Sequence, residues 1–318
     1  MQDCLQEQFR LILEREHPIS SENTSAQKDW LAYLALLVAI VCIGWSAIFV
    51  RWTDVPGSVS AFYRMLIPAA ILLPTFFVRG NTRPLSRRSL GIIALGGIFF
   101  ALDLALYNSS ILRTTAANAT LLGNNSPIFV GLLTWLVFRR RPQAAFWLGL
   151  LLAVGGSLVI LRSDLVQHTQ FGLGDAMSVG AAAFFAMYLL ATEEVRGTIG
   201  TLQFLRLAML STTVALFLIN ILLGHSFRVA SGRTWAALIG LGLVSQLGGY
   251  IALTYALGHL PATVTSVSLL TQGPLTALLA AVLLHEPLSG SQIAGGVMVL
   301  IGVGVAHRQK HPEEEANV

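Results

Sequence analysis

The side chain best placed to do chemistry is Asp103, which lies near the middle of a long apolar run. Its neighbours are phenylalanine, alanine and leucine, so its carboxylate lies far from the charged ends of that run. A charge at the centre of a lipid bilayer costs roughly 2.5–3.5 kcal/mol, so this side chain should face the protein interior. Asp103 could then exchange a proton or bind an amine. The alternative is an internal structural hydrogen bond.

Two arginines, Arg64 and Arg206, also lie within apolar runs, and each follows a phenylalanine by two residues. An arginine can hold a carboxylate through two parallel hydrogen bonds, so both are candidates to bind an acidic group. The structural alternatives are an ion pair with Asp103, a cap on helix carbonyls, or a side chain that extends to the membrane surface.

Polar and aromatic side chains gather in the same runs. Asn124 and Gln272 lie shortly before Pro127 and Pro274, and a proline frees a backbone carbonyl one turn back. These amides therefore either bind a ligand or satisfy the freed carbonyl. Aromatic rings suit flat or amphipathic ligands, and packing is their alternative role. The candidate binding residues are Trp45, Arg64, Asp103, Tyr107, Asn108, Asn124, Tyr188, Arg206, Tyr250, Tyr255 and Gln272.

The sequence carries no pattern typical of an enzyme or a metal site. Its two cysteines, Cys4 and Cys42, form no zinc spacing, and His285 with Glu286 is explained by a helix that stops before Pro287. The motifs GxSxG, HExxH and GxxxxGK[ST] are missing, which argues against hydrolysis and against an ATP-driven pump. We therefore expect no catalytic residue, no metal and no cofactor.

Composition indicates an integral membrane protein. Of the 318 residues 54% are hydrophobic and only 11% are charged, whereas soluble domains carry roughly 25% charged residues. The charges leave apolar windows of about 20 residues, enough for a helix to cross the bilayer. Barrel strands would be about 10 residues long and alternating, so helices are expected. The net charge of +4 lies mostly between the runs and does not indicate a nucleic-acid partner.

The hydropathy pattern predicts ten transmembrane helices. The spans are 31–51, 58–78, 89–111, 114–138, 143–162, 174–192, 202–223, 234–257, 262–284 and 290–307. With both termini in the cytoplasm, the basic clusters in 79–88 and 139–141 fall on the cytoplasmic side, as the positive-inside rule requires. The expected location is the plasma (inner) membrane, as a multi-pass protein.

The spacing of prolines and glycines indicates an internal duplication. A short turn, a mid-segment proline, a polar stop and a glycine-containing run occur in 108–156 and again in 255–302. Five helices per copy is an odd number, so the second copy must enter the bilayer inverted, which suits a binding site between the halves. The glycines permit close helix contact, either within one chain or in a homodimer.

The run 255–262, Pro274, the segment 285–288 and the glycine pair at 295–296 give the chain a family resemblance. They resemble the ten-helix EamA group of the drug/metabolite transporter superfamily. The resemblance implies a first repeat at 30–163 and a second at 172–307, with tails at 1–29 and 308–318. Glu286 fits the family pattern, but its first-half counterpart is Arg139, so the sequence assigns no acidic role to both positions.

The resemblance implies a secondary transporter that exports or exchanges small metabolites by alternating access. Because Arg64, Asp103 and the aromatic residues together could hold a zwitterion, amino acids or aromatic compounds are the expected substrates. Proton coupling through Asp103 and solute exchange alone are the two candidate driving forces. An intramembrane enzyme and a membrane receptor or scaffold without transport stay as the alternative functions.

Overall fold

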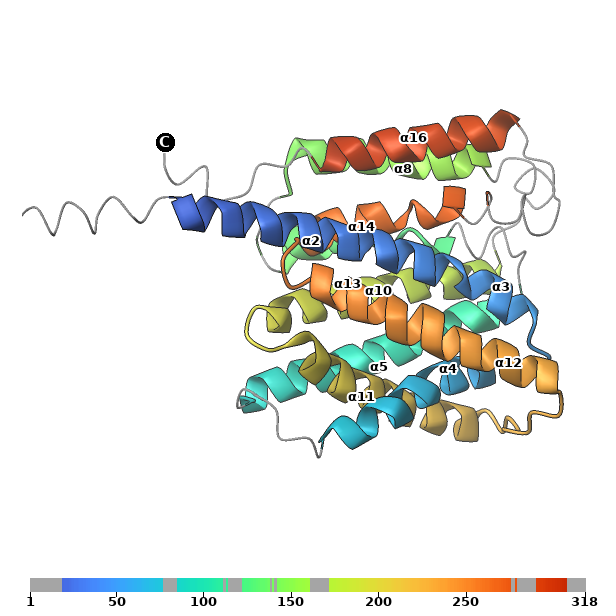
Figure 1. Ribbon diagram of the computed structural model, residues 1–318. Helices are drawn as coiled ribbons and strands as arrows, with labels where there is room; N and C mark the ends of the chain where they lie inside the picture. Colours follow the sequence, from blue (N-terminus) through green and yellow to red (C-terminus); the bar gives the residue numbers. More distant parts are fainter. Residues whose placement is uncertain are drawn as a thin grey trace, which may run out of the picture.

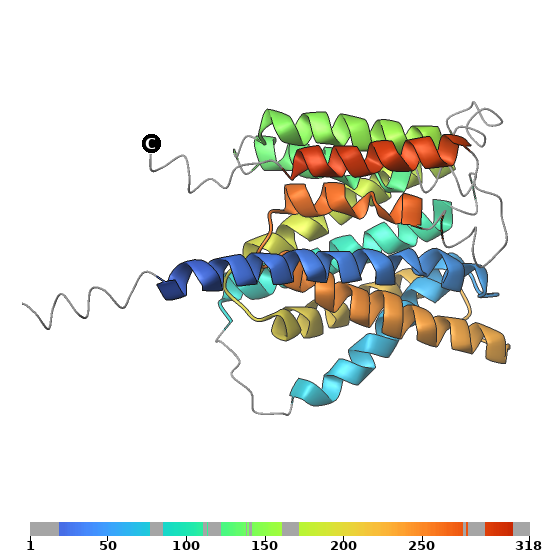
Figure 2. The same cartoon turned by 45° about the horizontal axis from the view of Figure 1, so that its top comes forward.

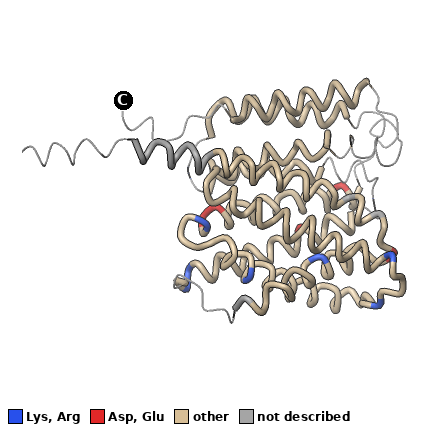
Figure 3. Tube along the Cα trace, viewed as in Figure 1, with Lys and Arg blue, Asp and Glu red and all other residues tan. Residues whose placement is uncertain are grey.

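In the computed structural model of the chain, every regular element among the described residues is a helix (Figure 1). These residues are 19–76, 85–110, 113, 122–137, 139, 142–160, 172–275, 278 and 290–307. Within these ranges, five helices are long and apolar enough to cross a membrane, and shorter apolar helices accompany them. The charged residues lie mostly towards the two ends of the bundle (Figure 3), as expected for helices whose middle sections face lipid or one another.

Over the described residues the helices make ten spans, five in each half of the chain. The first half contains α2 (Ile19–Gly44) with α3 (Ser46–Arg51), α4 (Gly57–Leu72) with a short 3-10 turn η1 (Leu73–Phe76), α5 (Arg87–Ser110), α7 (Ser126–Leu136) and α8 (Ala144–Ile160). The second contains α10 (Leu173–Arg196), α11 (Thr201–Leu222), one span formed by α12 (Gly232–Gly240), η2 (Leu241–Gly248) and α13 (Gly249–Ala256), then α14 (Ala262–Leu269) and α16 (Gly290–Ala306). The two sets are inverted five-helix repeats.

The first span differs from the predicted one at both ends. The helix begins at Ile19, inside the stretch 1–29 that the sequence predicts as a tail, because a helix satisfies its own backbone bonds and can extend beyond the apolar run. It then breaks at Trp45, whose carbonyl accepts hydrogen bonds from the amides of Ile48 and Phe49 at 3.1 and 3.2 Å. The break separates α2 from α3 and places Ser46 at the start of α3.

The spans that contain Pro127 and Pro274 are both interrupted shortly before the proline. In the first half the chain turns at 124–125 before α7 begins at Ser126, and in the second it turns at 270–271 after α14. The amide of Thr271 donates to the carbonyl of Ser268 at 3.0 Å, a three-residue spacing that an α-helix does not have. The predicted spans 114–138 and 262–284 are thus not continuous helices. Their parts at 114–121, 138, 276–277 and 279–284 lie outside the described residues.

The apolar core has two parts. The larger lies among α2, α4, α5, α10, α11 and α13, and the smaller lies between α8, α14 and α16, around Phe146, Leu150 and Val299. Large apolar side chains on the outside of the helices are exposed, with Leu151 71% and Leu222 85% accessible. An outer surface of this kind fits a lipid environment.

The last helix of each half packs directly on the other. α8 and α16 lie side by side in Figures 1 and 2, and glycines from both form the contact. A Cβ atom at Gly156 would lie 2.5 Å from the carbonyl oxygen of Gly295, and one at Gly149 would lie 2.5 Å from that of Gly302. The predicted small-residue contact is therefore made within one chain.

A polar cluster joins the beginning of α4 to the end of α11. The Ser58 hydroxyl lies 2.8 Å from Asn220 Oδ1 and 2.8 Å from His225 Nδ1, and Asn220 Nδ2 donates to the Ser58 carbonyl at 3.0 Å. Asn220 Nδ2 also donates to the Leu216 carbonyl at 2.9 Å. Both Ser58 and Asn220 are buried, so this cluster fixes one end of the bundle.

Asn220→Leu is therefore expected to destabilise the protein. The substitution leaves the Ser58 carbonyl without its Asn220 donor and the Ser58 hydroxyl with His225 alone, and a buried unsatisfied group costs about 1–3 kcal/mol. The melting temperature of purified protein in detergent should fall clearly. His225→Ala, which removes a half-buried partner of the same hydroxyl, should lower it less. An unchanged melting temperature for Asn220→Leu would contradict the structural role.

Candidate functional site

Arg64 is a buried arginine that connects the two halves of the chain. It lies on α4, and its Nε donates a hydrogen bond of 2.7 Å to Oε1 of Gln246, on η2 of the second half. Its Nη1 donates to the Ser46 hydroxyl at 3.1 Å, and its guanidinium carbon lies 5.9 Å from the ring centroid of Tyr250. The charge is thus held by neutral acceptors and an aromatic face rather than by a carboxylate.

Asp103 lies on α5 beside this arginine but does not bond to it. Its carboxylate is within electrostatic range of Arg64 and of Tyr250. Over the described residues it makes neither a hydrogen bond nor an ion pair within 4 Å, and its side chain is only partly buried. The pair with Arg64 that the sequence offered as a structural alternative is therefore not formed in this conformation.

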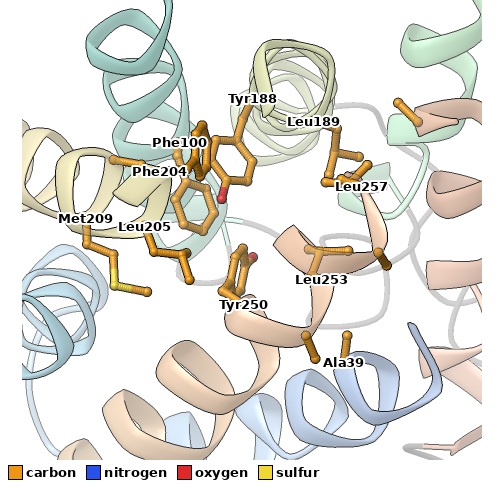
Figure 4. Close-up of a cluster of buried hydrophobic side chains, with 14 of the residues drawn as sticks. Ala39, Phe100, Tyr188, Leu189, Phe204, Leu205, Met209, Tyr250, Leu253 and Leu257 are labelled. Carbon is orange, nitrogen blue, oxygen red and sulfur yellow. The ribbon is translucent and has the colours of Figure 1, made fainter. Parts of the chain in front are cut away.

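Aromatic rings from four helices pack together beside Arg64 and Asp103. Phe100 on α5 stacks on Tyr188 of α10 with centroids 4.4 Å apart, and the Tyr250 ring of α13 lies 5.0 Å from Phe100 (Figure 4). Phe204 of α11 completes the group at 6.5 Å from Tyr188. All four are buried. We call Phe100, Tyr188, Phe204 and Tyr250 the aromatic cluster.

The sequence placed Tyr188 and Tyr250 among the candidate binding residues. Gln246 belongs to the same group of polar residues in the second half but is not in that candidate set, and neither is Phe100. Phe100 precedes Asp103 by three residues and Gln246 precedes Tyr250 by four, and residues at these spacings are neighbours on one helix face. That spacing is the signal that could have found both. Gln246 lies in η2, a stretch of π-helix, which single-sequence patterns do not reveal.

Three further candidates lie at one end of α5. Asn108 is buried and its Nδ2 donates to the Gly57 carbonyl at 2.8 Å, so it fastens α5 to the start of α4. Tyr107 is half-buried, and its ring lies against Gly123, where an added Cβ would be 2.9 Å away. Asn124 follows in the turn before α7. This group lies near the first interrupted span, and at least Asn108 has a structural function.

The remaining candidates are Tyr255, Arg206, Trp45 and Gln272, and the contacts described for them are with residues other than the aromatic cluster. Tyr255 stacks on His259 at 4.5 Å and interacts electrostatically with Arg196, near the end of α13. Arg206 is half-buried on α11, so it does not repeat the buried position of Arg64. Trp45 packs at 6.1 Å from Phe49 and precedes Ser46, a partner of Arg64. Gln272 is half-buried in the turn region after α14.

The site thus contains an arginine with neutral partners, a carboxylate that has no hydrogen-bond or ion-pair partner among the described residues, and an apolar aromatic wall. Across the described ranges, no group of three or more His, Cys, Asp or Glu side chains is placed to hold a metal ion. An arrangement with separate positive and negative groups next to aromatic rings can bind a small molecule that carries both charges.

Comparison with known proteins agrees with this architecture. The chain is 28% identical to a pseudopaline exporter of Pseudomonas aeruginosa, over 80% of this chain and 87% of that protein. It is 24% identical to an uncharacterized transporter of Archaeoglobus fulgidus, over 87% of this chain and 98% of that one. A solved crystal structure with 19% identity has the same fold, with a TM-score of 0.72 over 86% of this chain and 96% of the other.

A family model describing EamA-like transporters matches the chain twice, at residues 30–162 and 172–307. The two matches coincide with the two five-helix halves of the structure and cover nearly all of its spans. The protein is a multi-pass membrane transporter with a small-molecule substrate, and the chain belongs to the EamA-like transporter family.

Proposed function

We propose that this transporter exports or exchanges small zwitterionic metabolites, such as amino acids and related aromatic compounds. The observation that carries the proposal is the pair of opposite charges, Arg64 and Asp103, which lie near each other at the centre without forming an ion pair. A substrate with a carboxylate and an amine would satisfy both groups at once. The aromatic cluster would receive its apolar part.

Two further observations support this assignment. Arg64 spans the halves through Gln246, so a ligand bound there would contact both repeats, as alternating access between inverted repeats requires. The similarity to a pseudopaline exporter favours export of a metabolite over uptake. In this scheme the halves rock about the central site and expose it to one side of the membrane at a time.

The membrane arrangement that goes with this function follows from charge. Both termini face the cytoplasm, the membrane is the plasma (inner) membrane, and the functional units are the repeats at 30–163 and 172–307 with the tails 1–29 and 308–318 outside them. Asp103 is the group through which a proton gradient would drive export, with solute exchange as the alternative. A homodimer is compatible with this scheme but is not needed for it.

Counterflow in proteoliposomes tests the proposal. Vesicles preloaded with one unlabelled amino acid at a time should accumulate the same labelled solute, whereas vesicles without protein should not. Matched solutes that lack the amine or the carboxylate should be carried poorly. Solute-independent behaviour over a broad panel, with protein shown to be folded by its melting temperature, would contradict the proposed function and would favour the enzyme or receptor alternatives.

Asp103→Asn is expected to separate the two driving forces. The amide keeps the size of the side chain but loses the charge that would bind an amine or a proton, so counterflow should fall about 10-fold or more. Residual transport should no longer respond to a pH gradient. Asp54→Asn, the same change at an exposed loop position, should leave the gradient response intact. A gradient response that persists in Asp103→Asn would rule out Asp103 as the coupling group.

A further inference from the structure

Gln246 has an unused hydrogen-bonding group in the centre of the protein. Its side chain is completely buried, with 0% of its surface exposed. The atom that lies 2.7 Å from Arg64 Nε must be the amide oxygen, because an arginine only donates hydrogen bonds. The orientation of the amide is therefore fixed, and Nε2 is the atom left over. That Nε2 is buried and has no hydrogen-bond partner among the residues that the structure describes.

The position of Gln246 on the helix adds a second observation. Gln246 belongs to η2, where the α-helical pattern gives way to a π-helix, and short π segments inside α-helices occur frequently at functional sites. The hydroxyl of the preceding residue, Ser245, is also buried without a partner in the described part of the chain. Since buried polar groups are nearly always bonded, two neighbouring exceptions call for an explanation.

The unused groups of Gln246 and Arg64 have the same chemistry. Arg64 donates through Nε to Gln246 and through Nη1 to Ser46, which leaves its Nη2 without a hydrogen bond over the described residues. Nε2 of Gln246 is bonded to the same carbon as the oxygen that accepts from Arg64. The N–H donors of Gln246 Nε2 and of Arg64 Nη2 therefore both belong to this one hydrogen-bonded pair of side chains. Two adjacent donor groups with one positive charge match the two oxygens of a carboxylate.

We infer that Gln246 and Arg64 together bind the carboxylate of the transported solute, with Gln246 donating a hydrogen bond through Nε2. The inference rests on the proposed function and adds a direct substrate ligand from the second half of the chain. The solute then contacts Arg64 and Asp103 of the first repeat and Gln246 of the second. Gln246 is therefore a group by which the second repeat recognises an acid rather than its neutral analogue.

The alternative is that Gln246 only positions Arg64, and Gln246→Glu distinguishes the two. Glutamate keeps an oxygen that can accept from Arg64 Nε, so a positioning role would survive the change. It removes the Nε2 donor and adds a negative charge where the carboxylate should bind. For a solute ligand, the KM for an amino acid should rise about 10-fold or more, with little change for the corresponding amino-acid amide.

The wild type provides a test that does not depend on the folding of a variant. Wild-type protein should carry an amino acid at least about 10-fold more efficiently than its amide, because the amide lacks the second anionic oxygen. If Gln246→Glu does not fold, Gln246→Met replaces it, since methionine has similar length and no N–H donor. Gln292→Glu on α16 is the matched control and should leave the KM of both solutes unchanged.

The outcomes separate the inference from the proposed function. Wild-type protein that carries no zwitterion overturns the proposed function itself. Wild-type protein that carries amino acids and their amides equally well overturns the carboxylate site. A third outcome is that wild-type protein prefers the amino acid over its amide and that Gln246→Glu or Gln246→Met keeps this preference unaltered. This result assigns the carboxylate to Arg64 alone and overturns the role of Gln246. Loss of acid selectivity in Gln246→Glu, which keeps an oxygen that can accept from Arg64 Nε, supports it when the melting temperature is retained.

Discussion

Arg64→Ala is expected to reduce counterflow of zwitterionic solutes by about 100-fold or more. The substitution removes the buried positive charge and its two hydrogen bonds to Gln246 and Ser46. A hydrogen bond that involves a charged group contributes about 1.5–3 kcal/mol, so losing the substrate contact and the positioning contact together exceeds a factor of 100. The measurement is initial counterflow at substrate concentrations below the KM.

Arg64→Lys should be nearly as damaging as Arg64→Ala. Lysine keeps a positive charge but lacks the planar guanidinium. Arginine can donate to Gln246 and Ser46 and still have N–H donors left to bind the substrate. Arg228→Ala, at an exposed position in the loop after α11, is the control and should retain full counterflow. Undiminished zwitterion transport by folded Arg64→Ala protein would show that the central arginine does not bind the substrate.

Gly156→Leu is expected to disrupt the packing of α8 on α16 and to give the largest loss of stability. A Cβ atom at Gly156 would lie 2.5 Å from the Gly295 carbonyl oxygen and 2.7 Å from the Val299 amide nitrogen, and both are backbone atoms that cannot rotate away. Overpacking a core position costs about 1–3 kcal/mol, and a leucine at a backbone contact should reach or exceed the upper end. The melting temperature and the monodisperse fraction in detergent measure the effect.

The neighbouring glycine supplies a close control for this experiment. At Gly155 an added Cβ would lie 3.6 Å from Met298 Cε, which is an ordinary van der Waals distance. Gly155→Ala should therefore be neutral or slightly stabilising, since alanine is favoured over glycine in a helix by about 1 kcal/mol. Gly156→Ala should lower the melting temperature. Equal behaviour of the two alanine variants would mean that the α8–α16 contact does not limit stability.

The spans and the duplication could be predicted because lipid imposes simple rules on sequence. Helices must be long and apolar, and charges must lie at their ends or inside the protein, so the sequence predicts that Asp103 faces inward. For Arg64 it leaves open a side chain that extends to the membrane surface. A duplication with five helices in each copy predicts the inverted arrangement, and the two family matches confirm the two repeats. These features depend on residue type and spacing alone.

The partners of the central residues could not be predicted in the same way. Gln246 and Ser46 contact Arg64 because of how α4, η2 and the break at Trp45 are oriented toward one another. The spacing of residues in one sequence does not show which faces of different helices meet. The polar extension of α2 to Ile19 and the interruptions before α7 and after α14 were missed for a related reason. Hydropathy indicates which residues lie in the membrane. It does not indicate where a helix bends or continues, because that depends on packing and hydrogen bonding.

The glycine contact between α8 and α16 also has a genetic consequence. Gly156 and Gly295 are each limited by the other's backbone carbonyl, with a Cβ at either one lying 2.5 Å from the partner's oxygen. A second mutation usually rescues an enlarged side chain by shrinking the residue that faces it, but glycine has nothing left to remove. Selection for suppressors of Gly156→Leu should therefore return true revertants or changes elsewhere, and none at position 295.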